Sequence, residues 1–114
     1  MDNCLFCKII KGDIPANKVY ENEHILAFRD IDPKAPVHIL VIPKKHIKSI
    51  NDLKSSDKYL AGELIFASKK IAKDQGIDSK GFRTIFNTND DGGQTVYHIH
   101  MHIMGGRQMK WPPG

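Results

Sequence analysis

The chain has 114 residues, of which 40% are hydrophobic and 26% are charged, and its formal net charge is +4. This length suits one domain with a modest core, and the composition is ordinary for a globular protein rather than a disordered or fibrous one. The lysines are dispersed, no apolar run approaches the ~20 residues of a membrane span, and no segment resembles a secretory signal. We therefore expect one domain over residues 1–114 in the cytoplasm, with no membrane partner and without nucleic-acid binding as its main role.

The first expected element is a short helix over residues 5–11, where apolar residues recur at roughly helical spacing and Gly12 follows as a C-cap. Two strands are expected next, over residues 18–21 and 24–31, joined by a turn. A link rich in turn-forming residues then leads to a strand over residues 37–42. This strand is apolar apart from one histidine, so we expect it to be central and buried on both faces.

The one long helix is expected to begin near Ser55 and to end near Gly76, because apolar residues recur between them at three- and four-residue intervals. Two further strands are expected over residues 82–87 and 96–104. Five strands joined mostly by turns, with one long and one short helix, predict an antiparallel α+β domain. Residues 106–114 include two prolines and are expected to form a C-terminal extended arm.

Three histidines, His98, His100 and His102, alternate with large apolar residues in the last predicted strand. Alternate residues of a strand point to the same face, so the imidazoles would form a row while the intervening side chains pack behind the sheet. Imidazole can act as base, nucleophile or metal ligand near neutral pH, so the row indicates a reaction centre. A histidine-rich patch that only binds metal, or an accidental polar face, is the alternative.

Cys4 and Cys7 form a Cys-x-x-Cys pair near the beginning of the chain. In a cytoplasmic protein such a pair favours a metal or redox role over a structural disulfide. The redox motif is typical of a βαβ context, which is missing here. Two free thiols that bind nothing are the remaining alternative.

The histidine row is accompanied by further motifs along nearly the whole chain: Phe6–Gly12, Ala27–Ile31, Ala35–His38, Val41–Ile47, Gly92–Thr95, Gly105–Met109 and Trp111–Gly114. Together these segments resemble the histidine-triad (HIT) superfamily, in particular its Hint branch of nucleotide-binding proteins. The resemblance implies a HIT-like fold whose five-stranded sheet dimerises into a continuous sheet. It also implies a homodimer in which the arm bearing Trp111 reaches toward the pocket of the partner.

The resemblance implies a hydrolase that cleaves the P–N bond of purine nucleoside 5′-phosphoramidates, with AMP or GMP as the nucleotide part. The reaction passes through a covalent nucleotidyl-histidine that water later hydrolyses. The role of nucleophile falls to His100, and His102 would donate to a phosphate oxygen. His38, which on its own would be a core histidine, would line the same pocket.

Thr95 stands where Hint proteins commonly carry a serine that assists the leaving amine, and threonine keeps the hydroxyl but adds a methyl group. Asn87 and the backbone of Gly93 are implied phosphate contacts, although residues 89–93 alone are typical of a hairpin turn. Asp30 would accept hydrogen bonds from the ribose hydroxyls. The base would lie among apolar residues that composition alone assigns to the core: Leu5, Phe6, Ile9, Phe28 and Ile31.

A subset of the family with the N-terminal cysteine pair holds zinc, and the corresponding ligands here are Cys4, Cys7, His46 and His98. Two thiolates and two imidazoles make a closed tetrahedral site, which is structural because no position remains for an activated water. No organic cofactor is implied.

Two other functions stay open at this point. A dinucleoside polyphosphate hydrolase would use the same triad on a longer substrate, but Gly105–Met109 and Trp111–Gly114 argue against that branch. A nucleotide- or zinc-binding regulatory module with negligible turnover would have no need of His100.

Overall fold

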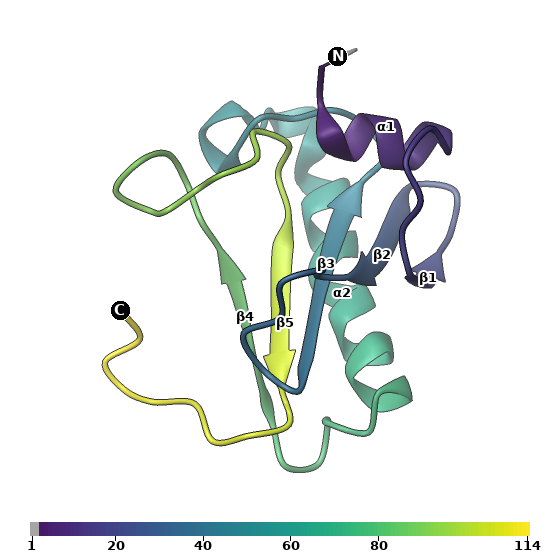
Figure 1. Cartoon of the computed structure of the whole chain (residues 1–114). Coiled ribbons are helices and arrows are strands. Elements are labelled where there is room, and N and C mark those ends of the chain that lie inside the picture. Colours follow the sequence, from purple (N-terminus) through teal and green to yellow (C-terminus); the bar gives the residue numbers. More distant parts are fainter. Residues whose placement is uncertain (1–2) are drawn as a thin grey trace.

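One five-stranded antiparallel sheet organises the computed structural model, which describes residues 3–114 (Figure 1). The strands lie in the order β1-β2-β3-β5-β4, so β5 returns between β3 and the edge strand β4. The predicted class, α+β with five antiparallel strands, one long helix and one short helix, is confirmed. The elements are α1 (Leu5–Lys11), β1 (Lys18–Glu21), β2 (Ile25–Arg29), β3 (Val37–Pro43), η1 (Ile50–Asp52), η2 (Ser55–Asp57), α2 (Lys58–Asp74), β4 (Phe82–Phe86) and β5 (Met101–Gly105).

The two helices pack against opposite faces of the sheet. On β3, Ile39 and Val41 point into a buried cluster with α2, whereas Leu40 and Ile42 point into a second cluster with Phe6 of α1. This alternation follows from the two-residue period of a strand. It confirms that β3 is central and buried on both faces.

Helix α1 has the bounds that the apolar spacing predicted. The Cys7 backbone N–H donates to the Cys4 sulfur at 3.4 Å, which caps the first turn. Gly12 has φ 85°, a left-handed conformation that glycine adopts without a Cβ penalty, and the helix ends there. The cap therefore fixes Cys4 and Cys7 side by side at the N-terminal end of α1.

The ends of two other elements differ from the prediction. The long helix begins at Lys58 rather than near Ser55, because residues 55–57 form a 3₁₀ turn in which the buried Asp57 carboxylate accepts from the Lys54 N–H. Its C-terminal end is as predicted, with Gly76 left-handed at φ 72°. Strand β2 is shorter than residues 24–31, because polar side chains at both ends accept bonds from the backbone instead of leaving it to the sheet.

The prediction of one strand over residues 96–104 is wrong in its first half. β5 begins only at Met101, which pairs with Val41 of β3. Continuing this register by two residues would place Ile99 opposite Pro43, which has no N–H to donate. The Ile99 N–H donates instead to the Ile47 carbonyl at 2.6 Å. His98 and His100 therefore lie before the strand rather than in it.

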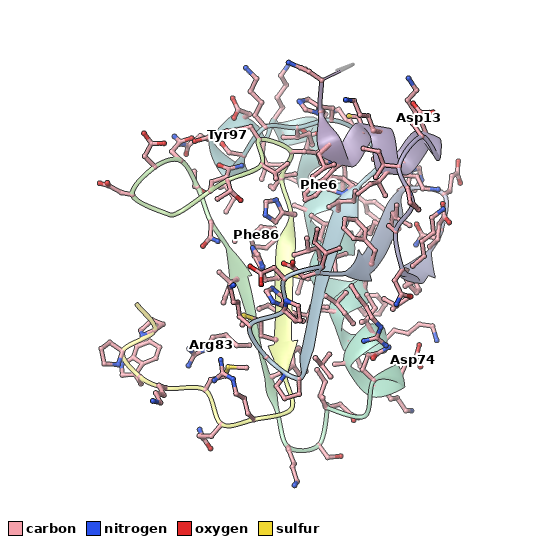
Figure 2. All side chains as sticks on the ribbon, in the orientation of Figure 1. Phe6, Asp13, Asp74, Arg83, Phe86 and Tyr97 are labelled. Carbon is pink, nitrogen blue, oxygen red and sulfur yellow. The ribbon has the colours of Figure 1, made fainter. Side chains whose placement is uncertain are left out.

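The C-terminal arm, residues 106–114, forms neither helix nor strand. Arg83 of β4 holds it, since its guanidinium donates to the Lys110 carbonyl at 2.9 Å and lies 5.9 Å from the centre of the Trp111 ring. Figure 2 shows Arg83 on the side of β4 nearest this arm. Among the helices of residues 3–114, none has the length and apolar character needed to cross a membrane.

Candidate active site and metal centre

A cavity of about 240 Å³ lies between α1, the end of β2 and the residues that lead into β5. Its apolar part contains Phe6, which points from α1 toward the sheet (Figure 2) and packs edge-on against Phe28 with ring centres 5.5 Å apart. Nine residues predicted to bind nucleotide line this cavity: Leu5, Phe6, Ile9, Phe28, Asp30, Ile31, Thr95, His100 and His102. Residues from both ends of the sequence thus meet at one place only after folding.

Three predicted nucleotide contacts do not line the cavity: Asn87, Gly93 and Trp111. The Gly93 N–H expected at the phosphate already donates to the Asp90 carbonyl at 3.0 Å, within its own turn. The Trp111 ring is 81% exposed and lies against Arg83 of the same chain. The described chain by itself therefore forms an open cavity, and Ile31 at its rim is 99% exposed.

The orientation of His100 is set by one backbone carbonyl. Its Nδ1 lies 2.8 Å from the His98 carbonyl oxygen. A carbonyl only accepts, so Nδ1 carries the proton and Nε2 keeps its lone pair. The Phe6 ring lies edge-on at 5.1 Å between centres and restricts the imidazole further. The result is a buried histidine with a fixed tautomer and a free nucleophilic nitrogen.

His38 and His102 form a hydrogen-bonded chain behind the cavity. The Lys34 backbone N–H donates to Nδ1 of His38 at 3.0 Å, so the His38 proton is on Nε2, which lies 2.9 Å from Nδ1 of His102. The proton of neutral His102 is therefore on Nε2. This buried nitrogen has no hydrogen-bond partner within residues 3–114. A phosphate oxygen in the cavity would satisfy it.

This arrangement corrects the expectation that His38 lines the pocket, because Leu40 and His102 line it while His38 is 5% exposed behind them. Asp30 lies 3.4 Å from Nε2 of His38. The ligand atoms of Asp30, His38 and His102 are within 4.8 Å of one another, close enough for a cation. His38 and His102 already share a proton through their hydrogen bond, however, so we interpret this group as a hydrogen-bonded chain rather than as a cation site.

The histidines of the site are neutral at pH 7. Burial, together with the neighbouring histidines, lowers the pKa of His98 and of His102 to about 4. Burial also lowers the pKa of His100 and of His38, although the Asp30 carboxylate opposes the effect on both. The 3.4 Å approach of Asp30 to His38 is therefore a contact with a neutral imidazole rather than an ion pair. Neutral His100 suits the role of a nucleophile.

The four predicted metal ligands, Cys4, Cys7, His46 and His98, meet beside α1. Nδ1 of His98 lies 3.5 Å from the Cys4 sulfur, 3.6 Å from the Cys7 sulfur and 3.2 Å from Nδ1 of His46. Ligands at 2.0–2.3 Å from one tetrahedral ion are separated by roughly 3.3–3.8 Å, so these atoms fit one zinc ion. The Cys7 sulfur lies 3.4 Å from Nδ1 of His46, which agrees with the same geometry.

The tautomer of His98 also fits a metal. Its Nε2 lies 2.8 Å from the Pro43 carbonyl and carries the proton, so Nδ1 turns a lone pair toward the cysteines and His46. Burial lowers the pKa of His46, which keeps its imidazole neutral as a ligand must be. Burial and Cys4 raise the pKa of the Cys7 thiol, and a bound cation would reverse this effect.

Sequence reasoning missed two kinds of contributor. The Lys34 amide that fixes His38 is a main-chain group, for which no side-chain pattern exists. Residues 14–16 line the cavity because the left-handed Gly12 turns the chain back along α1. The sequence does predict the Gly12 cap. A left-handed glycine reverses the direction of the chain, and this reversal is the signal that could have placed residues 14–16 beside α1.

Known proteins are similar to this chain over nearly its whole length. The model of the HIT domain matches residues 11–109. An uncharacterized HIT-like protein of Synechococcus elongatus is 49% identical over 113 residues, 99% of this chain and 98% of that protein. The 14 kDa zinc-binding protein of Zea mays is 47% identical over 112 residues, 96% of this chain and 87% of that protein.

Solved structures show the same fold. A HIT family hydrolase of Legionella pneumophila superposes with a TM-score of 0.96 at 56% identity, covering 98% of this chain and 100% of that one. A histidine triad protein of Clostridium difficile superposes with a TM-score of 0.92 at 47% identity, covering 96% of this chain and 95% of that one. With its HIT fold and hydrolase-like framework, the chain belongs to the HIT family.

Proposed function

We propose that this chain hydrolyses the P–N bond of purine nucleoside 5′-phosphoramidates through a nucleotidyl-His100 intermediate. The observation that carries the proposal is the bond from Nδ1–H of His100 to the His98 carbonyl, which leaves the Nε2 lone pair free at the cavity. A binding module would gain nothing from a buried nucleophile held in this tautomer.

In the proposed complex the base lies among Phe6, Ile9 and Phe28, and Asp30 accepts from the ribose hydroxyls. The α-phosphate then lies near His100, and the unpaired Nε2–H of His102 donates to a nonbridging oxygen. Both groups line the same cavity. Binding would therefore place the phosphorus within reach of the nucleophile.

The reaction has two displacements. Nε2 of His100 attacks phosphorus, the P–N bond breaks, and the electron pair leaves with the amine, which takes up a proton from solvent with the assistance of the Thr95 hydroxyl. Water then attacks phosphorus and returns a proton to solvent, the bond to Nε2 breaks with its electron pair going back to the imidazole, and the 5′-mononucleotide leaves with His100 neutral again. Replacing one difficult displacement by two easier ones is the advantage of a covalent route.

We also propose that Cys4, Cys7, His46 and His98 hold one structural zinc ion. The interatomic distances fit a tetrahedral ion, and a relative in Zea mays is named for zinc binding. A bound zinc would join α1, which carries part of the cavity lining, to the segments around His46 and His98. Two reduced cysteines as ligands favour a cytoplasmic location.

The proposal includes one domain over residues 1–114 and a homodimer with a continuous sheet. β4 is an edge strand, and large apolar side chains are exposed in the single chain, among them Phe66 at 71% and Trp111 at 81%. A second copy would cover such surface and the free edge. In the dimer, the arm would bring Trp111 to the pocket of the partner.

The test is a turnover assay on adenosine and guanosine 5′-phosphoramidates, with a dinucleoside polyphosphate as the contrasting substrate. We expect multiple turnovers of the phosphoramidates and little hydrolysis of the dinucleotide, with the activity lost in His100→Gly. AMP binding without turnover would support a regulatory module instead. Preferred hydrolysis of the dinucleoside polyphosphate would support the other enzyme class.

A further inference from the structure

Gln94 is a buried polar residue, 7% exposed, whose side chain is fully used. Its Oε1 accepts from the Asn89 N–H at 2.9 Å. Its Nε2 donates to the Lys48 carbonyl at 2.7 Å and to the Val96 carbonyl at 3.1 Å. One amide thus joins three separate places in the backbone, although Gln94 itself does not line the cavity.

The loop that Gln94 closes is conformationally demanding. Asn89 has φ 57°, in the left-handed region that a non-glycine residue rarely adopts, and Gly93 has φ 78°. At Gly92 an added Cβ would clash with the Thr88 carbonyl. Because Asn89 also accepts from the Gln94 backbone N–H at 3.0 Å, Gln94 fixes this loop through both its backbone and its side chain.

The bond to Lys48 connects the loop to the segment that follows β3. The same segment contains Ile47, whose carbonyl accepts from the Ile99 N–H at 2.6 Å. Residues 94–99 are therefore anchored at both ends to residues 47–48. Thr95 and Val96 lie between these anchors and line the cavity together with His100.

We propose that Gln94 is a positioning residue that sets the Thr95 hydroxyl relative to His100 and so controls the departure of poorly leaving amines. This inference rests on the proposed function. Removing the side-chain amide would take away the partner of three backbone groups, the Asn89 N–H and the Lys48 and Val96 carbonyls, and release the main chain on both sides of Thr95. The nucleophile would stay in place, because His100 is held by His98 and Phe6.

The first test compares two substrates in the full-length protein and in Gln94→Met, which keeps the side-chain length but removes the amide. One substrate is the phosphoramidate of AMP with an alkylamine, and the other is the p-nitrophenyl ester of AMP, whose leaving group needs no proton. We expect the alkylamine rate to fall by roughly 10- to 100-fold, as a small misplacement can cause. The ester rate and the Kd of AMP should change by less than about threefold, since contacts unrelated to the leaving group remain.

The second test is a double-mutant cycle with Thr95→Val. If Gln94 acts through Thr95, Gln94→Met in the Thr95→Val background should lower the alkylamine rate by less than about threefold. Gln108→Met is the matched control, because Gln108 is exposed and its side-chain amide donates to the adjacent Met109 carbonyl, away from Thr95. If Gln94→Met does not fold, Gln94→Glu keeps the acceptor for Asn89 and replaces the donor to Lys48 and Val96 by a carboxylate oxygen.

The outcomes are distinguishable. Equal losses for both substrates, or full additivity with Thr95→Val, would overturn the positioning role while leaving the proposed function intact. A parent protein inactive on both substrates would overturn the proposed function and this inference together. A selective loss with the alkylamine, absent from the Thr95→Val background and from Gln108→Met, is the expected result.

Discussion

Lowering the pH should destabilise the folded protein through His102. Burial lowers its pKa to about 4, whereas the unfolded chain has the ordinary value of about 6.5. Between these two values the unfolded state binds more protons than the folded state. The contribution of neutral His102 to the free energy of unfolding is therefore complete above pH 6.5 and is lost as the pH falls toward 4. At 1.36 kcal/mol per pKa unit, linkage gives a loss of about 2 kcal/mol from this residue between pH 7.5 and 5.

The assay is urea unfolding of the parent and of His102→Gln at pH 7.5 and at pH 5. The difference between the two proteins isolates His102, because carboxylates and the metal centre contribute equally to both. We expect the parent to lose about 2 kcal/mol more than the variant over this interval. The imidazole resonance of His102 should titrate near pH 4. A titration near pH 6.5, or the same pH dependence in both proteins, would refute the argument that burial keeps His102 neutral.

Two further predictions concern the ribose contact and the metal centre. Asp30→Ala should weaken AMP binding by about 1–3 kcal/mol in calorimetry, since charge-assisted hydrogen bonds are lost, and should have a much smaller effect on a 2′,3′-dideoxy analogue. Equal losses for both ligands would show that Asp30 does not contact the ribose. The parent should contain one zinc ion per chain by elemental analysis, whereas Cys4→Ser combined with Cys7→Ser should lose the zinc and lower the Tm while some activity persists. Full zinc content in this double variant would contradict the ligand set.

The elements that local pattern determines could be predicted from the sequence. The short helix ends at Gly12 and the long helix ends at Gly76, because a left-handed glycine terminates a helix whatever lies around it. The apolar strand over β3 was identified with its two buried faces for a similar reason, since it has polar character only at His38. Composition alone assigns Phe6 and Phe28 to the core, and both lie in one buried apolar cluster.

What the sequence could not predict depends on register and on backbone groups. The last strand is shorter than its alternation suggested, because Pro43 on the neighbouring strand offers no N–H to residue 99. The tautomer of His38 is set by the Lys34 amide, and the Gly93 N–H is consumed within a turn. Trp111 lies outside the cavity of its own chain and against Arg83, because the expected contact of this residue is with a partner chain.

The identity of the nucleophile is tested most directly by rapid quenching of the reaction with a labelled adenosine 5′-phosphoramidate, followed by peptide mapping by mass spectrometry. The account predicts one nucleotidyl group on the peptide that contains His100. This adduct should form and decay fast enough to explain turnover and should be absent from His100→Gly. Turnover without any adduct, or an adduct on another residue, would contradict the covalent role of His100.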